Sequence, residues 1–139
     1  MTNHTLAASY ILKARKRVKA LAVLLQEEAF SDVVREAQEI VELCLKAALR
    51  VAGIDPPKIH DVGGLVHDHS ARFPPLFAAH IPRLVAISGW LRKEREFAFC
   101  GDIDFIPTEQ YSQQQAQRAF DDATFVVDVI QTLKPGDSP

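Results

Sequence analysis

The sequence predicts an all-α fold, an antiparallel up-and-down helical bundle of four long helices with one or two short helices. Apolar residues recur every three or four positions along most of the 139-residue chain, which is the spacing of one face of an α-helix. No segment alternates apolar and polar residues between hairpin turns, as a strand would. Prolines interrupt or end the periodic segments, at Pro56–Pro57, at Pro74–Pro75 and at Pro135. Helices joined by such short breaks pack as antiparallel neighbours.

The composition is that of one ordinary globular domain. The chain is 47% hydrophobic and 24% charged, and its net charge of −2 excludes binding of nucleic acid through overall charge. We expect one domain over residues 1–134 and a disordered tail over 135–139. The N-terminus lacks a basic stretch followed by an apolar run, and no apolar stretch approaches the roughly 18 residues of a spanning helix. With only two cysteines, these features predict a cytoplasmic protein that does not contact a membrane.

The first helix is expected over about residues 6–28. Its apolar stripe is Leu6, Tyr10, Ala14, Val18, Leu21 and Leu25. A basic run from Lys13 to Lys19 lies beside this stripe, and at 100° per residue Arg15, Lys16 and Lys19 point away from it. The run has the charge to touch phosphates, but no aromatic residues are interleaved as stacking platforms, which favours a solvated helix face.

The second helix is expected over about residues 32–52. Ser31 and Asp32 suit its N-cap, and Gly53 suits its C-cap. The core stripe is Val33, Ala37, Ile40, Cys44, Ala47 and Val51, widened by Val34, Val41, Leu45 and Ala48. This is the most regular helical pattern in the chain.

A polar edge runs along the same helix. Its members are Glu39, Glu42, Lys46 and Arg50. Glu42 precedes Lys46 by four residues, the favourable order for a helical ion pair. An ordinary surface ion pair is the simpler interpretation. The alternative is one wall of a cleft beside the proline-stiffened loop that carries His60.

The remaining elements follow in order. We expect a short helix over about 61–70, a helical turn over 76–79, a helix over 82–95, a loop over 97–107 and a last helix from Thr108 or Ser112 to about 133. The inner side of the helix over 82–95 is formed by Leu84, Ile87 and Leu91. An alanine-rich stripe forms the inner side of the last helix. Ser112 followed by Gln115 is a capping-box pattern.

No metal, cofactor or nucleophile site emerges from these patterns. The residues closest to a metal-binding set are His60, Asp61, His67, Asp68 and His69. His67 and His69 are two positions apart and so lie on different sides of a helix, which disfavours one shared ion. Cys44 lies on an apolar stripe and is expected in the core, and Cys100 is expected as a packed loop residue.

Several of these segments together resemble the HEPN (higher eukaryotes and prokaryotes nucleotide-binding) family. The likeness covers about residues 5–134. It is carried by Tyr10, Ala14 and Arg17; by Ala37–Leu49, with its glutamates and Lys46-Ala47; by Gly53 and then His60-Asp61-Val62-x-x-Leu65; by Arg92-x-x-Arg95-Glu96 and Phe99-Cys100-Gly101-Asp102; and by Ala116, Ala119 and Ala123.

The resemblance implies a helical bundle that pairs with itself as a homodimer and has a link to nucleotides or RNA. Many members are encoded beside a minimal nucleotidyltransferase and form a two-component, toxin–antitoxin-like complex with it. Members that are ribonucleases carry Arg-x(4–6)-His, with both side chains pooled across the dimer cleft. No such spacing exists in this chain, since the positions that would hold histidine after Arg92 and Arg95 do not. Without that imidazole no general base is evident, and no catalytic residue is assigned.

By this resemblance the chain is expected to be a non-catalytic module that binds a nucleotide or a nucleotidyltransferase. Lys46 and Arg95 are expected to contact phosphate oxygens, and Glu42 and Asp102 to orient them or to contact sugar hydroxyls. His60 is expected at the rim of this nucleotide-binding site. Two alternatives remain open: a metal-independent ribonuclease with a non-standard base, for example His60 acting with Arg95, and a purely structural adaptor subunit.

Overall fold

The structure is a computed structural model that describes residues 3–58, 62–100 and 111–133, and every regular element in these ranges is a helix. The α-helices are α1 (Asn3–Gln26), α2 (Phe30–Val51), α3 (Val62–Asp68), α4 (Pro75–Ala78), α5 (Ile81–Cys100) and α7 (Gln113–Ile130), and the 3₁₀ turns are η1 (Ser70–Arg72) and η2 (Gln131–Leu133). The predicted all-α bundle is therefore confirmed. No helix in the described ranges has the length and apolar content needed to cross a bilayer.

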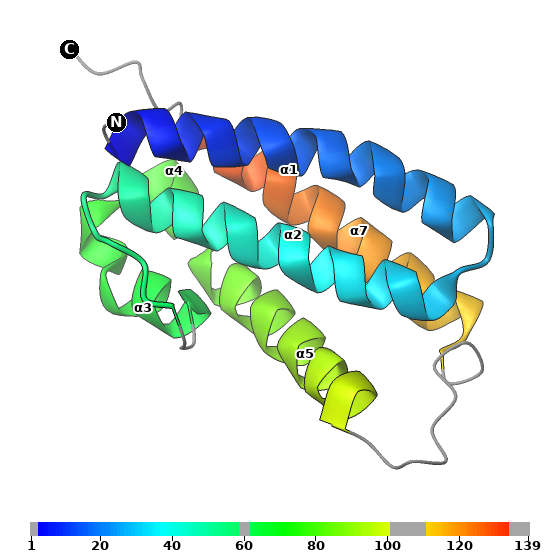
Figure 1. Ribbon diagram of the computed structural model, residues 1–139. Coiled ribbons are helices and arrows are strands. Elements are labelled where there is room, and N and C mark those ends of the chain that lie inside the picture. Colours follow the sequence, from blue (N-terminus) through cyan, green and yellow to red (C-terminus); the bar gives the residue numbers. More distant parts are fainter. Residues whose placement is uncertain (1–2, 59–61, 101–110, 134–139) are drawn as a thin grey trace.

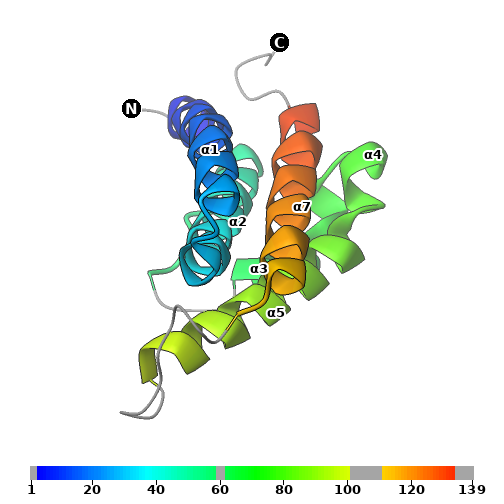
Figure 2. The ribbon, with the colours of Figure 1, turned by 90° about the vertical axis from the view of Figure 1, so that its right-hand side faces the viewer.

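Helix α2 lies at the centre of the molecule (Figure 1). It runs antiparallel to α1 and packs against α1, α7, α5 and α3. Figure 2 shows that α5 crosses α7 obliquely, so the two helices meet over a short stretch and then diverge. The short elements α3 and α4 lie at one end of the bundle.

Small side chains form much of the contact between α2 and its neighbours. The fully buried alanines are Ala7 and Ala14 on α1, Ala37, Ala47 and Ala48 on α2, and Ala116, Ala119 and Ala123 on α7. Such residues allow helix backbones to approach closely, and larger residues such as Ile40, Leu45 and Phe77 fill the space between them. Nearly the whole circumference of α2 is consequently covered, which leaves only narrow strips for polar side chains.

The predicted apolar stripe of the first helix needs correction. Ala7 and Ile11 are buried, whereas Leu6 and Tyr10 are only partly covered. The stripe is therefore rotated by about one position at its start. The reason is that both α2 and α7 pack against α1. Together they cover more of its circumference than the single face that the spacing indicated.

The predicted N-cap of the second helix is wrong. Helix α2 begins at Phe30, its N-cap position is Ala29, and no side chain caps it. The preceding turn explains the shift: Glu28 has φ 61°, and the Ala29 N–H donates to the Leu24 carbonyl at 2.9 Å. This closed turn delivers the chain directly into α2, so Ser31 lies inside the first helical turn.

The end of α2 agrees with the sequence. Gly53 has φ 81°, and its N–H donates to the Arg50 carbonyl at 3.0 Å. The Ile54 N–H donates to the Leu49 carbonyl at 2.8 Å, which completes a Schellman motif. The predicted glycine C-cap is confirmed.

Helices α5 and α7 differ in how well the sequence predicted their ends. Helix α5 continues to Cys100, five residues beyond the predicted end, because neither glycine nor proline occurs between Arg95 and Gly101. Residues 97–100 of the predicted loop are thus helical, and the rest of that loop lies outside the described residues. Ser112 caps α7 through the predicted capping box with Gln115.

Candidate functional site

The predicted ion pair on α2 is present. The Nζ atom of Lys46 lies 3.5 Å from Oε1 of Glu42, one helical turn earlier. Their side chains are 29% and 32% exposed, so both charged groups reach solvent while their stems lie against the protein. We call this pair the Glu42–Lys46 edge. It presents one ammonium and one carboxylate at a half-buried position.

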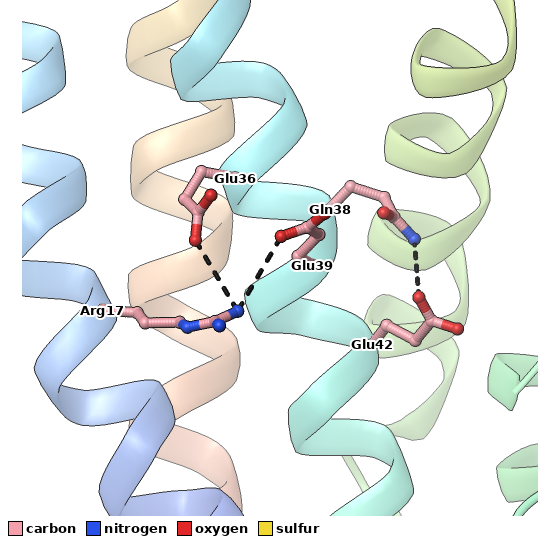
Figure 3. Close-up of polar contacts among 5 residues, drawn as sticks. All are labelled: Arg17, Glu36, Gln38, Glu39 and Glu42. Carbon is pink, nitrogen blue, oxygen red and sulfur yellow. Dashed lines mark hydrogen bonds and ion pairs between the residues drawn. The ribbon is translucent and has the colours of Figure 1, made fainter. Parts of the chain in front are cut away.

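A buried glutamine continues this edge towards the start of α2. Gln38 is 6% exposed, and its Nε2 atom donates to Oε2 of Glu42 at 3.2 Å. Figure 3 shows Gln38 and Glu42 on the flank of α2 that faces α5. The glutamine fixes one carboxylate oxygen while the other contacts Lys46, so Glu42 is held from both sides. Sequence reasoning missed Gln38, although its position one turn before Glu42 was a usable signal.

The opposite flank of α2 carries a separate polar contact. Nη1 of Arg17 on α1 lies 3.7 Å from Oε1 of Glu36 and 3.8 Å from Oε2 of Glu39 (Figure 3). This guanidinium ties α1 to α2. It also means that Glu39 faces α1 rather than sharing the flank of Glu42.

Arg50 departs from the predicted polar edge as well. Its Nη1 atom lies 3.5 Å from Oδ1 of Asp55, and its guanidinium carbon lies 5.8 Å from the centroid of the Tyr10 ring on α1. The single edge expected from helical spacing is therefore divided. Glu39 and Arg50 serve contacts with α1 and the following loop, and only Glu42 and Lys46 remain for the candidate site.

The other predicted site residues stay predictions. His60 and Asp102 lie outside the described residues, and Arg95 is described only as part of the α5 backbone. Of the five predicted residues, the structure brings together Glu42 and Lys46. The described pair offers charge-assisted hydrogen bonds to an anionic ligand, since an ammonium at a half-buried position binds phosphate oxygens well.

The cysteine on α2 is a core residue, as predicted. Cys44 is fully buried, and burial raises the pKa of its thiol to about 12. The thiolate is the reactive form of cysteine, so this side chain is inert at neutral pH.

A cluster of side chains joins α5 to α7. Nε1 of Trp90 donates to Oδ2 of Asp122 at 2.9 Å, and the Arg118 guanidinium lies 4.1 Å from the centroid of the Trp90 ring. The guanidinium carbon of Arg83 likewise lies 3.7 Å from the centroid of the Phe125 ring. These contacts border an open groove of about 840 Å³. Among the described residues, two arginines and two aspartates line that groove, so their charges balance.

A tyrosine fixes the start of α7 against α5. The Tyr111 hydroxyl lies 3.1 Å from the carbonyl oxygen of Glu94 and 3.3 Å from its Oε2 atom. Burial, together with the negative charge and hydrogen bond of Glu94, raises the pKa of Tyr111 to about 12. This contact and the Trp90 cluster fix α7 against α5, the helix that the flank with Gln38 and Glu42 faces.

The fold and this edge define a small all-α helical-bundle protein with a charged, half-buried pair on its central helix. The family model described as HEPN domain matches residues 7–133. The chain belongs to the HEPN domain family, as its sequence motifs indicated. The comparisons with curated proteins and with solved structures returned no match.

Proposed function

We propose that this chain is a non-catalytic HEPN-type module that binds a nucleotide, as a homodimer, through the Glu42–Lys46 edge. The observation that carries the proposal is the geometry of Lys46. Its ammonium lies 3.5 Å from a carboxylate that the buried Gln38 holds in place, so the cation is positioned before any ligand arrives. Pre-positioning lowers the ordering cost of binding a phosphate group.

The sequence supports a binding role over a cleaving one. Arg-x(4–6)-His, the spacing associated with the family's ribonucleases, does not occur in the 139 residues. Hydrolysis of RNA by that chemistry needs a group that removes the proton of a ribose hydroxyl. The described part of the candidate site supplies an ammonium and a carboxylate already paired with each other.

Calorimetric titration with ATP and GTP tests this proposal. We expect binding at or below millimolar nucleotide, and we expect Lys46→Met to weaken it by about tenfold or more through loss of a charged hydrogen bond. Arg35→Met is the matched control, because Arg35 is an exposed cation on the same helix, 3.6 Å from Asp32. Absence of binding at millimolar concentration, or equal weakening by both substitutions, would show that the nucleotide role is wrong.

A partner nucleotidyltransferase in a toxin–antitoxin-like pair is the second candidate. The observation that favours it is the exposure of two large apolar residues on one helix, Leu12 (50%) and Val23 (55%) of α1. A contiguous apolar surface indicates contact with another protein, and Leu12 lies beside Val18 and Val127 in one surface groove. Co-expression with a nucleotidyltransferase from a neighbouring reading frame tests this candidate, and a stable complex of the two chains is the expected result.

A further inference from the structure

Helix α1 has an unusual charge. It carries five basic residues and no acidic residue: Lys13, Arg15, Lys16, Arg17 and Lys19. The chain as a whole has a net charge of −2, so the rest of the chain taken together is acidic while α1 is strongly basic. A field of one sign concentrated on one helix attracts a ligand of the opposite sign.

Most of this charge is not neutralised within the described structure. Arg17 is paired with Glu36 and Glu39 of α2. The other four basic side chains are exposed, and none lies within ion-pair distance of a carboxylate in the described ranges. Arg17 therefore has a structural role, whereas its four neighbours are available to a partner.

A groove runs beside these cations between α1 and α7. Its main part holds about 320 Å³ and is lined by Leu12, Arg15, Lys16, Val18, Lys19, Thr124, Val127, Asp128 and Gln131. A second hollow of about 250 Å³ adjoins it and shares Leu12, Arg15 and Gln131 with it. We call the two together the α1–α7 groove. Leu12, half exposed, belongs to both parts and gives the groove an apolar centre.

We propose that the α1–α7 groove is a docking site for an acidic amphipathic helix of another protein. The occupant follows from charge complementarity: the α1 wall offers Arg15, Lys16 and Lys19, and the apolar centre accepts aliphatic side chains, as in helix-in-groove recognition. This inference is independent of the proposed nucleotide role, because it concerns α1 and α7 and not the Glu42–Lys46 edge. It stands whether or not a nucleotide binds there. Since exposed Leu12 also supports the partner candidate above, the inference specifies the surface and the chemistry that a protein partner would use.

The rival occupants fit the groove less well. Single-stranded RNA is bound through aromatic stacking platforms, and none of the described residues that line the groove is aromatic. A second copy that docked α1 against α1 across a twofold axis would place the same cations opposite each other. A foreign acidic helix meets neither obstacle.

The α7 wall adds a directional requirement. Asp128 lies on that wall, opposite the cations of α1, together with the neutral Thr124 and Gln131. A docked helix therefore needs carboxylates along the edge that faces α1, and an amide or a basic residue along the edge that faces Asp128. Like charges placed opposite each other are strongly unfavourable, so this asymmetry sets the orientation of the helix.

Selection from a displayed library of helical peptides tests the inference. The peptides have about 20 residues, which span roughly 30 Å. The target is the full chain, and the Lys16→Glu/Lys19→Glu variant serves for counter-selection. We expect selected peptides to have aliphatic residues three and four positions apart, carboxylates along one edge and amides or basic residues along the other. A labelled selected peptide is then titrated by fluorescence anisotropy.

Matched variants decide the result. Lys16→Glu/Lys19→Glu is expected to weaken peptide binding by about tenfold or more, and Leu12→Ala by several-fold. Lys93→Glu on α5 and Leu76→Ala on α4 alter an exposed cation and an exposed leucine elsewhere, and are expected to have no effect. Circular dichroism verifies that each variant is folded, and ATP titration of each distinguishes this groove from the nucleotide site.

Four outcomes would overturn the inference: selected peptides without acidic enrichment, binding that the α1 substitutions do not change, binding that the two control substitutions reduce equally, or a dimer that the α1 substitutions dissociate. A labelled single-stranded RNA is titrated in parallel. Binding of that RNA in place of peptide, lost in Lys16→Glu/Lys19→Glu, would instead identify the groove as a phosphate-binding surface.

Discussion

The indole nitrogen of Trp90 on α5 donates a hydrogen bond to Oδ2 of Asp122 on α7, with a distance of 2.9 Å. Arg118 reinforces the contact, because its Nε atom lies 3.8 Å from the same carboxylate oxygen and its guanidinium covers the Trp90 ring. Since α5 and α7 cross obliquely and share little backbone contact (Figure 2), these side chains hold the crossing in place. The position of α5 relative to α7 thus depends on a few polar contacts, whereas its buried apolar side chains pack against α2 and α3.

Asp122→Ala should loosen that crossing. The substitution leaves the partly buried Trp90 N–H without its acceptor, and we expect the free energy of unfolding to fall by about 1–3 kcal/mol. Trp90 is the only tryptophan, so its fluorescence reports the change directly, as a red shift in the folded state. Asp121→Ala is the control, since Asp121 is exposed and contacts Gln117 on its own helix. An unchanged emission maximum in Asp122→Ala would contradict the assigned role.

Two serines near helix starts should respond differently to removal of the hydroxyl. The Ser112 Oγ accepts from the Gln115 N–H at 3.2 Å, so Ser112→Ala should reduce stability by about 1 kcal/mol. Ser31 lies inside the first turn of α2 and caps nothing, so Ser31→Ala should change stability by less than about 0.5 kcal/mol. Urea unfolding of both variants measures the difference. Equal losses would refute the observed start of α2.

Two glycines should give changes of opposite sign. Gly53 has φ 81°, and Gly53→Ala should cost about 1 kcal/mol because side chains disfavour that region. Gly89 lies within α5, and a Cβ added there meets no described atom within 4 Å. Gly89→Ala should therefore stabilise the protein by up to about 1 kcal/mol, through helix propensity. Thermal unfolding of the two variants side by side checks both signs.

The buried thiol should make stability fall at alkaline pH. The pKa of Cys44 is about 12 in the folded protein against 9.0 for an ordinary thiol. Below pH 9 the thiol is protonated in both the folded and the unfolded chain, so its contribution to stability is fully present. Above pH 9 the thiol of the unfolded chain ionises first, and stability is progressively lost up to the pKa of the folded protein. Tyr111 adds a loss of the same sign from its ordinary value of 10.0 upwards.

Cys44→Ala isolates that contribution. The variant should lose stability less steeply than the parent between pH 9 and 10, where Tyr111 contributes little. Chemical denaturation at several pH values gives the slope of the free energy of unfolding against pH for each protein. The difference between the two slopes is the test, because removing a buried sulfur also lowers stability at every pH. Parallel slopes would mean that Cys44 is not protected by burial.

The sequence was most informative where one helical face or one turn determined the outcome. The core stripes of α2 and α7, the glycine C-cap at Gly53 and the capping box at Ser112 depend on residues close together in the chain, and all are confirmed. The start of α2 was missed because it depends on the turn at Glu28, a residue whose positive φ no local pattern predicts.

The candidate site was predictable only as far as one helix extends. Helical spacing placed Glu42 and Lys46 together correctly. It also grouped Glu39 and Arg50 with them, and the structure separates those residues because Arg17 and Tyr10 of α1 lie opposite them. Which neighbouring helix a polar residue faces depends on tertiary packing, and the residue spacing within one helix does not indicate it.

Incubation of the full chain with structured RNA distinguishes a HEPN bundle that only binds from one that cleaves. We expect intact RNA after prolonged incubation, with no difference between the parent chain and His60→Ala. Cleavage by the parent chain that His60→Ala abolishes would instead establish a ribonuclease with a non-standard base.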